Sequence, residues 1–304
     1  MDKRIINTIV NRCLGYKRGE KLLIVCDYDT HELAVDFYNG ARELGIESVF
    51  IEMVPRRMHG EEVPETVANA LYATDLALLM TSKSMSHTKA RKKASKVYGA
   101  RIASMPGVSK GIMGRSILID YSLLHRKSVR LARLLTEGKR IEIYTEIGTS
   151  LVMSIDNRSG FTDDGLYTKR GAFGNLPAGE ACISPVEGTA NGRLVVDGSC
   201  PLTGKLKSPI EVIIKDGYAK NVPLSEMKSL RKKLGRCVFN VAELGIGLNT
   251  KALVTGNVLE DEKACGTAHI GFGNNISFGG GVDCPSHLDF VFKNPVILID
   301  DKRV

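Results

Sequence analysis

Side chains that commonly bind divalent metal ions gather in the second half of the chain. The set comprises two imidazoles and three carboxylates, namely Glu180, Glu243, His269, His287 and Asp289. These nitrogen and oxygen ligands suit Zn²⁺, Co²⁺, Mn²⁺ or Fe²⁺. The set contains no thiolate, so a structural cysteine-type zinc site is not expected. Five ligands rich in oxygen exceed the needs of one tetrahedral ion, and two ions that share a bridging carboxylate would use all five.

Glycines alternate with the candidate ligands in two of the segments. In the motifs ELGIG, which begins at Glu243, and HIGFG, which begins at His269, the ligand and the glycines occupy every second position. Because side chains alternate between the two faces of a strand, each motif predicts one apolar face and one ligand face. His287 and Asp289 share a face in the same way. Glycine beside a ligand leaves room for an ion or for the backbone of a substrate.

Glu180 follows the turn Pro177-Ala-Gly and precedes an apolar stretch. We expect it at a turn-to-strand junction, where a rigid element holds an accessible carboxylate. A single histidine or glutamate on a strand is usually solvated or paired with a neighbour, so it is the conjunction of four such segments that predicts a metal centre. Cys182, Cys265 and Cys284 lie near these segments and are expected to be packing residues.

The first part of the chain alternates strand and helix. Short apolar runs at residues 22–27, 48–54 and 75–82 predict buried strands, and residues 101–108 predict a fourth. Helical segments separate these runs, for example at residues 31–45. This alternation predicts a parallel sheet covered by helices.

From about residue 140 the pattern changes to short strands and turns. Residues 141–147 and 150–156 predict a hairpin around Gly148. Of the 31 glycines, 20 lie after Gly148, so this part turns often or brings its backbone close to other groups. We therefore predict an α/β domain over residues 1–135 and a glycine-rich, mainly β domain over residues 136–304 that carries the metal site.

Composition limits the partners that the chain can have. The formal net charge is +8, and 43% of the 304 residues are hydrophobic, which is an ordinary globular composition. The densest basic stretch, residues 89–96, has no interleaved aromatic side chains, so no nucleic-acid partner is expected. No apolar run of about 20 residues occurs, so no membrane span is expected. The seven scattered cysteines, without a C-x-x-C pair, predict reduced thiols and a cytoplasmic protein.

The motifs NLPAGE, AELGIG, AHIGFG and SHLDF, in this order, resemble those of the aminopeptidase T type of metallo-aminopeptidases. The resemblance is clearest over residues 174–292. It implies that two metal ions are bound by the residues that match the family ligands, namely Glu180, Glu243, His269, His287 and Asp289. It further implies a homodimeric hydrolase that releases N-terminal amino acids from short peptides by means of a metal-activated water.

Two features depart from the family pattern. Ile276 stands where family aminopeptidases carry a tyrosine near the metals, and the segment between His269 and His287 is shortened. In fold, the family also resembles an iron-dependent dioxygenase that opens a dihydroxypyridine ring, which implies a single iron held by fewer of these positions. A dioxygenase of that type acting on a small molecule is therefore the alternative to a peptidase, and a non-enzymatic protein with a vestigial metal site is a third.

A metal-dependent hydrolase needs a carboxylate that is not a ligand to accept the proton of the attacking water. Glu262, in the acidic segment before His269, is our candidate for this catalytic role, because its segment corresponds to an acidic one in the family. An exposed acidic turn is the alternative interpretation of the segment, and Glu187 is a second candidate for the role.

Overall fold

The computed structural model describes all 304 residues and divides into two compact units. The first unit comprises residues 1–121 and 165–178, and the second comprises residues 122–164 and 179–304. The predicted domain boundary at residues 135 and 136 falls inside helix α6 (Tyr121–Glu137), of which all but the first residue belongs to the second unit.

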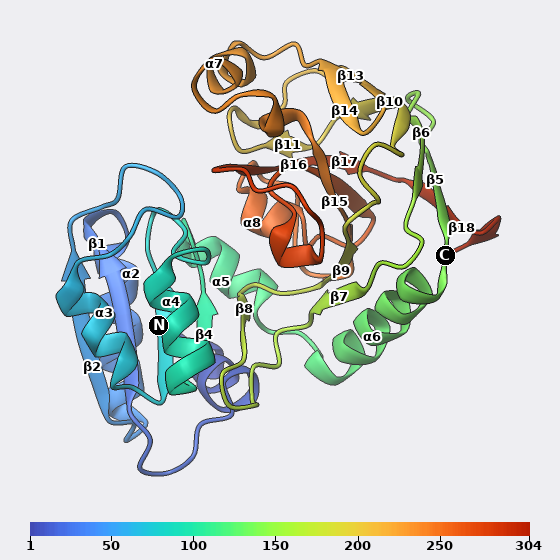
Figure 1. Cartoon of the computed structure of the whole chain (residues 1–304). Helices are drawn as coiled ribbons and strands as arrows, with labels where there is room; N and C mark the ends of the chain where they lie inside the picture. The colour runs from blue at the N-terminus through green and yellow to red at the C-terminus, as the bar shows by residue number, and fades with distance from the viewer. The chain divides into compact units, whose positions relative to one another are not determined.

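A five-stranded parallel sheet forms the centre of the first unit (Figure 1). Its spatial order is β2 (Ser48–Met53), β1 (Leu22–Asp27), β3 (Leu76–Met80), β4 (Arg101–Ser104) and β8 (Phe173–Asn175). Every residue of β1 is buried, as expected for a strand that is covered on both faces. The parallel α/β sheet predicted from the sequence is observed.

The helices of this unit lie before, between and after its first four strands in the sequence. They are α1 (Lys3–Asn7), α2 (His31–Glu43), α3 (Glu65–Tyr72), α4 (Lys89–Lys93) and α5 (Lys110–Ser116), with π-helical turns at Thr8–Cys13 and Ala94–Tyr98. Leu71 of α3 packs in one core with Val25 and Leu79 of the sheet. The sequence pattern does not predict β8, because its three residues become a strand only by pairing with β4.

Two seven-stranded antiparallel sheets form the second unit. One has the order β14 (Tyr218–Asn221), β13 (Ile210–Lys215), β10 (Asn191–Val196), β6 (Ser150–Ser154), β5 (Arg140–Tyr144), β18 (Val296–Ile299) and β19 (Lys302–Arg303). The other, which we call the ligand sheet, has the order β12 (Gly204–Lys205), β11 (Ser199–Cys200), β17 (His287–Lys293), β16 (Thr267–Gly273), β15 (Val241–Gly247), β9 (Glu180–Ile183) and β7 (Gly160–Asp163). The remaining helices are α7 (Ser225–Leu234) and α8 (Val258–Asp261).

The two antiparallel sheets share one hydrophobic core. The hairpin of β5 and β6, which the sequence predicts, contributes Ile143 and Leu151. The ligand sheet contributes Leu244 and Ile270 from β15 and β16. Because side chains alternate along a strand, the neighbours of these two residues lie on the opposite face of the ligand sheet. Helix α6, which the sequence interpretation omits, adds Leu135 to the same core.

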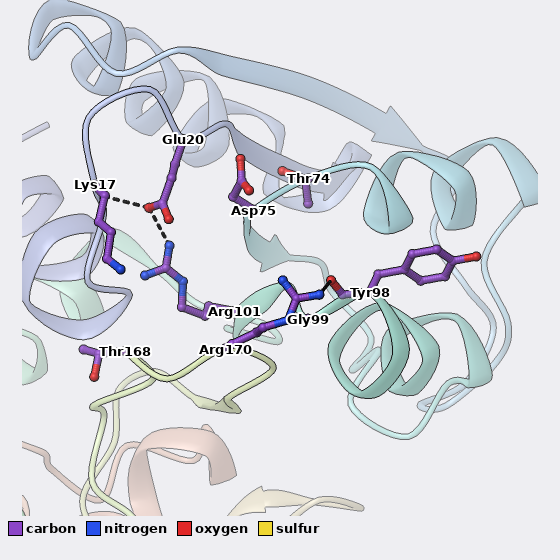
Figure 2. A pocket seen from close by; sticks show the side chains of 9 residues that line it. All are labelled: Lys17, Glu20, Thr74, Asp75, Tyr98, Gly99, Arg101, Thr168 and Arg170. Atoms are coloured by element: carbon purple, nitrogen blue, oxygen red, sulfur yellow. Dashed lines mark hydrogen bonds and ion pairs between the residues drawn. The ribbon is translucent and has the colours of Figure 1, made fainter.

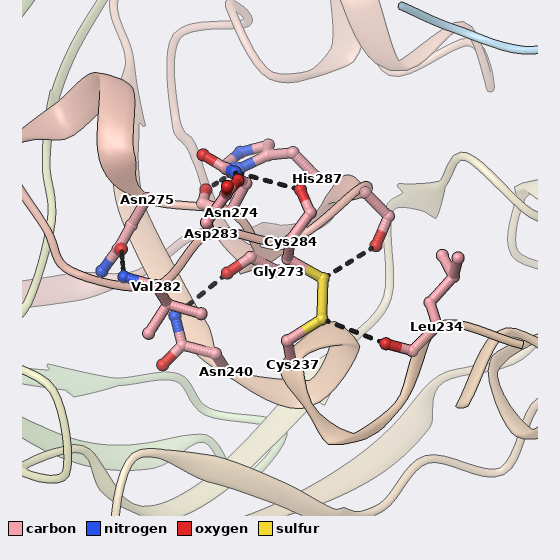
Figure 3. The surroundings of a disulfide bond; sticks show 11 residues. Leu234, Cys237, Asn240, Gly273, Asn274, Asn275, Val282, Asp283, Cys284 and His287 are labelled. Atoms are coloured by element: carbon pink, nitrogen blue, oxygen red, sulfur yellow. Dashed lines mark hydrogen bonds between the residues drawn. A yellow bond between two sulfur atoms is a disulfide. The ribbon is translucent and has the colours of Figure 1, made fainter. Parts of the chain in front are cut away.

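Cys237 and Cys284 form a disulfide bond (Figure 3). Their Cα atoms lie 5.7 Å apart, within the range that a disulfide spans. This corrects the prediction that all cysteines are reduced and that Cys284 is only a packing residue, because folding brings together two thiols that are distant in sequence. The other five cysteines are free. None of the helices combines the length and hydrophobicity needed to cross a membrane.

Candidate metal centre

Three neighbouring strands of the ligand sheet place four of the predicted ligands side by side. β16 pairs with β15 on one side and with β17 on the other. In this register His269 lies opposite Gly245, and Asp289 lies opposite Gly271. Glu243 and His287 each lie opposite a glycine as well. The alternation of glycine and ligand in the sequence therefore becomes a two-dimensional pattern across the sheet.

A side chain at these glycines would collide with the ligands. A Cβ atom at Gly245 would lie 2.0 Å from Cε1 of His269. A Cβ atom at Gly271 would lie 2.8 Å from Nε2 of His287 and 2.9 Å from Oδ1 of Asp289. Atoms cannot approach this closely, so bare backbone at both positions provides the space in which the imidazoles lie.

Strand β9 brings Glu180 to the site from a distant part of the sequence. Glu180 lies opposite Gly247 of β15 and is 7% exposed. The chain enters this strand through Gly179, whose φ of +136° is a conformation that favours glycine. A Cβ atom there would also lie 2.7 Å from Cβ of Asn249. Glu180 thus begins a strand, as the sequence predicts.

All five predicted ligands converge on one cluster, in which Glu180, Glu243 and His269 are buried and the other two are partly buried. Nε2 of His287 lies 2.9 Å from Oε2 of Glu243 and 3.0 Å from Oδ1 of Asp289. Nε2 of His269 lies 3.8 Å from carboxylate oxygens of Glu243 and Asp289 and 3.9 Å from Oε2 of Glu180. The side chains that are dispersed along the sequence therefore form a single site.

The loop between β16 and β17 orients His287 (Figure 3). Nδ1 of His287 lies 2.7 Å from the carbonyl oxygen of Asn274. Because a carbonyl oxygen only accepts a hydrogen bond, Nδ1 must carry a proton, which leaves Nε2 as the nitrogen that faces the carboxylates and can bind a metal ion. The Cys237–Cys284 disulfide holds this loop close to His287 in the sequence. His287 is thus oriented as metal-ligating histidines usually are.

Charges within the cluster shift the pKa values of its members. Burial alone would lower the pKa of His269, but Glu243, Asp289 and Glu180 outweigh it and raise this pKa to about 9. Burial alone would raise the pKa of Glu243, but the imidazoles of His269 and His287 outweigh it and lower the pKa. The cluster therefore attracts positive charge, whether protons or a metal ion supply it.

The donor atoms fit a divalent metal ion. Oε2 of Glu180 is buried without a hydrogen-bond partner and lies 3.9 Å from Nε2 of His269, although buried polar atoms are almost always paired. With neutral rings, the Nε2 lone pairs of His269 and His287 face carboxylate oxygens, an arrangement that needs a cation between them. Imidazole nitrogen and carboxylate oxygen are suitable ligands for Fe²⁺, Mn²⁺ and Zn²⁺.

Residues 259–264, shortly before β16, are buried. Glu262 is 8% exposed, so its interpretation as an exposed acidic turn is wrong. An oxygen of Glu262 lies within 4.8 Å of ligand atoms of His269 and Asp289. Burial raises the pKa of Glu262 to about 8, even though the neighbouring Lys263 opposes this shift. The predicted catalytic carboxylate therefore lies next to the ligands.

Lys263 is a member of the site that the sequence interpretation misses. It is 1% exposed. Its Nζ contacts Oε1 of Glu180 and lies 2.9 Å from Oε1 of Glu262 and 3.2 Å from Oδ2 of Asp163. In sequence, LEDEKA is typical of a charged surface turn. The one clue is that acidic groups are rarely buried without a partner, so acids beside a metal motif could have drawn attention to the lysine among them.

The site thus has two parts, which we name by their nitrogen groups. The imidazole end consists of Glu243, His269, His287 and Asp289. The ammonium end consists of Asp163, Glu180, Glu262 and Lys263.

Glu187, the second candidate for a catalytic base, belongs to a loop contact instead. Its carboxylate pairs with Arg158 and accepts hydrogen bonds of 2.8 Å from Nδ2 of Asn275 and from the backbone N–H of Gly281. These bonds lower the pKa of Glu187, although burial opposes them. A carboxylate with its oxygens occupied in this way is poorly suited to accept a proton from a substrate.

The first unit has a separate polar cavity of about 230 Å³ (Figure 2). Its two arginine side chains have protein partners: Arg101 pairs with Glu20, and Arg170 donates a hydrogen bond of 2.9 Å to the carbonyl oxygen of Tyr98. The cavity is not lined by any imidazole or thiolate. It therefore offers no second metal site of the kind found on the ligand sheet.

The fold and the site define a two-domain protein with a buried centre of imidazoles and carboxylates that suits a divalent metal. The family model described as 2,5-dihydroxypyridine 5,6-dioxygenase matches residues 8–304. The chain belongs to this family of enzymes.

The similar proteins agree with this assignment. A 2,5-dihydroxypyridine 5,6-dioxygenase of Pseudomonas putida is 24% identical over 196 residues, which cover 59% of this chain and 56% of that protein. The match thus spans little more than half the length of this relative. The solved structure of 2,5-dihydroxypyridine dioxygenase from Pseudomonas putida has a TM-score of 0.82 at 18% identity, covering 99% of this chain and 94% of that one. Wild-type AmpT from Thermus thermophilus has a TM-score of 0.69 at 13% identity, covering 99% of this chain and 96% of that one. At these identities the structural likenesses show the fold alone.

The prediction of a metallo-aminopeptidase is wrong, and with it the terms hydrolase and protease. The family model and the curated relative indicate a dioxygenase, while the likeness to AmpT is one of fold. The motifs failed to separate the two because they specify a ligand face on a sheet, and one such face can serve different reactions. The departures at Ile276 and in the shortened loop are the points at which the sequence pattern differed from a peptidase.

Proposed function

We propose that the chain is an iron-dependent dioxygenase that opens the aromatic ring of a dihydroxypyridine or of a closely similar compound. The observation that carries the proposal is the convergence of His269, His287 and Asp289 in a member of the 2,5-dihydroxypyridine 5,6-dioxygenase family. Two histidines and one carboxylate, with further positions open, are a ligand set of non-haem iron(II) oxygenases. When bound, the iron would supply the activation of O₂ that side chains alone do not provide.

Glu243 supports the two imidazoles in this proposal. Its Oε2 lies 2.9 Å from Nε2 of His287, and its Oε1 lies 3.8 Å from Nε2 of His269. One carboxylate thus contacts both rings from the neighbouring strand. It holds their nitrogens toward a common point, which keeps the ligands in place before the metal ion binds.

Glu262 is placed to exchange a proton with the substrate. Its pKa, raised to about 8 by burial, leaves both the protonated and the ionised form populated near neutral pH. That is the condition under which a carboxyl group is most effective as a general acid or base. In the proposed reaction Glu262 accepts the proton of a ring hydroxyl when the substrate binds and returns a proton to the ring-opened product.

An aromatic surface beside the ligands suits a flat substrate. The ring of Phe278 lies 5.5 Å from the imidazole of His287, measured between centroids, and the two planes are tilted by 35°. Phe161 meets the edge of Phe278 at 6.1 Å. Aromatic rings pack against other rings at such separations, and this supports a planar ring as the substrate better than it supports a peptide.

Oxygen consumption tests the proposal. Metal-free protein is loaded with Fe²⁺ under anaerobic conditions and mixed with dihydroxypyridine isomers in air-saturated buffer. We expect O₂ uptake that matches the loss of aromatic absorbance, and no uptake when Zn²⁺ replaces Fe²⁺. A protein that takes up no O₂ with any isomer but cleaves aminoacyl amides would contradict the proposal. The homodimer, the cytoplasmic location and the lack of nucleic-acid and membrane partners stay predictions.

A further inference from the structure

The ammonium end of the site has the geometry of an occupied cation site. Nζ of Lys263 contacts one carboxylate oxygen from each of Asp163, Glu180 and Glu262. An ammonium group has three N–H donors and no acceptor, so its donors and these three oxygens match in number. At 1% exposure, Lys263 has no room for water as an alternative partner.

The carboxylates around Lys263 require a cation. Asp163 of β7 and Glu180 of β9 lie directly opposite each other in the antiparallel pair. Like charges in such a position repel each other, and burial strengthens the repulsion. Glu262 brings a third acidic group to the same point. A positive charge between them is what allows more than one of these groups to be ionised in the folded protein.

The backbone fixes Lys263 in this place. Its N–H donates a 3.0 Å hydrogen bond to the carbonyl oxygen of Glu260, and its own carbonyl oxygen accepts one of 2.8 Å from the N–H of Asn249. The following turn packs against bare backbone, since a Cβ atom at Gly247 would lie 2.1 Å from the carbonyl oxygen of Ala264. Lys263 is therefore built into the sheet surface and does not swing in from solvent.

We propose that Lys263 takes the second cation position of this site and thereby limits the chain to one divalent metal ion, held at the imidazole end. Five ligands rich in oxygen exceed the needs of one ion, which is why the sequence predicts two. The ammonium group removes this excess, because Oε1 of Glu180 is the partner of Lys263, so this carboxylate cannot bridge two metal ions. Lys263 is thus a positioning residue. The inference rests on the single-metal site of the proposed function, but it does not depend on the reaction.

Counting metal ions tests this directly. Wild-type protein, Lys263→Met and the control Lys251→Met, which changes an exposed lysine, are saturated with Co²⁺ or Mn²⁺, desalted and analysed for metal per chain. We expect one ion for the wild type and the control and two for Lys263→Met. In metal-free form Lys263→Met should melt about 10 °C lower than the wild type, because buried carboxylates lose their partner, and added metal should reverse this loss.

A second variant decides the matter if Lys263→Met does not fold. Glu180→Gln removes a charge and retains the size of the side chain. If Glu180 pairs with Lys263 and does not bind the metal, the Kd for Co²⁺ should change less than about threefold, whereas Asp289→Asn should weaken it more than about 100-fold.

Three results would overturn the inference: two metal ions in the wild-type chain, a single ion in a folded Lys263→Met, or a loss of metal in Glu180→Gln as large as in Asp289→Asn. Because Co²⁺ and Mn²⁺ binding needs no O₂ and no substrate, these results are independent of the dioxygenase assay. A chain that binds one ion but consumes no O₂ would refute the proposed function and leave the role of Lys263 intact.

Discussion

The imidazole end and the ammonium end of the site neutralise the same kind of charge in different ways. At the imidazole end, Glu243 and Asp289 face two ring nitrogens whose protons a metal ion can displace into solvent. At the ammonium end, Glu180 faces a lysine with a strongly held proton. Burial alone would lower the pKa of Lys263, but its three carboxylate partners outweigh burial and raise it. The positive charge at the imidazole end can thus be exchanged for a metal ion, whereas the positive charge at the ammonium end is permanent.

The largest effect on metal binding is expected at the imidazole end. His287→Ala leaves Glu243 and Asp289 without their shared nitrogen, and we expect Fe²⁺ affinity to fall more than about 1,000-fold, since even changes in groups behind the ligands cost 10–100-fold. Competition with a chromophoric chelator measures the Kd. His31→Ala, which removes a half-exposed imidazole of the first unit, serves as the control. Equal metal content in the two variants would contradict the site.

Changes in pH should distinguish the two ends next. The pKa of His269 is raised to about 9, so a metal ion must displace its proton at neutral pH. Affinity then rises about tenfold per pH unit for each proton displaced, or at least about 100-fold from pH 6 to pH 8. The stability of the metal-free chain should depend on pH in the opposite direction. The stabilisation from protonated His269 is complete below its ordinary pKa of 6.5 and is lost as pH rises through about 9.

Calorimetric titration with Mn²⁺ in two buffers of different ionisation enthalpy counts the protons released and checks this prediction. Proton release close to zero at pH 7 would mean that the imidazoles are already neutral in the metal-free protein.

A smaller effect is expected from the glycine pattern of the ligand sheet. Gly245→Ala places a methyl group where the ring of His269 lies, so the ring must move and Fe²⁺ affinity should fall about 30-fold, in the range of changes that misalign a ligand. The matched control is Gly114→Ala in α5, where a Cβ atom meets nothing within 4 Å. It should leave affinity unchanged and slightly stabilise the helix. Identical affinities in the two variants would show that the imidazole tolerates displacement.

The smallest expected effect concerns the substrate. Phe278→Ala removes the ring that lies beside His287 and should raise the KM for a dihydroxypyridine about fivefold, which is the scale of one aromatic contact. Metal content should not change. Tyr28→Ala, at an exposed aromatic residue of the first unit, is the control. Steady-state O₂ uptake measures both variants, and a lower kcat at constant KM would assign Phe278 to another role.

The imidazole end could be predicted from the sequence because the pattern that defines it lies within single strands. Alternation within β15, β16 and β17 shows which side chains share a face, and the glycines at every second position mark the open face. The parallel strands of the first unit follow equally well from their continuous apolar runs.

The ammonium end could not be predicted in this way. The side chains of Asp163 and Lys263 become partners only through the pairing of β7 with β9 and the path of the turn before β16. A lysine among acidic residues in sequence normally indicates solvent, and only the register of the folded sheet shows otherwise. The Cys237–Cys284 disulfide and strand β8 escape prediction for the same reason, since each depends on contacts between distant segments.

Strands β15, β16 and β17 are successive in the chain and adjacent in the sheet, so the whole imidazole end comes from one antiparallel meander. Pairing strands that are close in sequence costs less chain entropy than pairing distant segments. Metal ligands gathered on such a unit can bind an ion before β7 and β9 have joined the sheet. The order of assembly would then be the meander and its ion first, with Asp163 and Glu180 arriving later to meet Lys263.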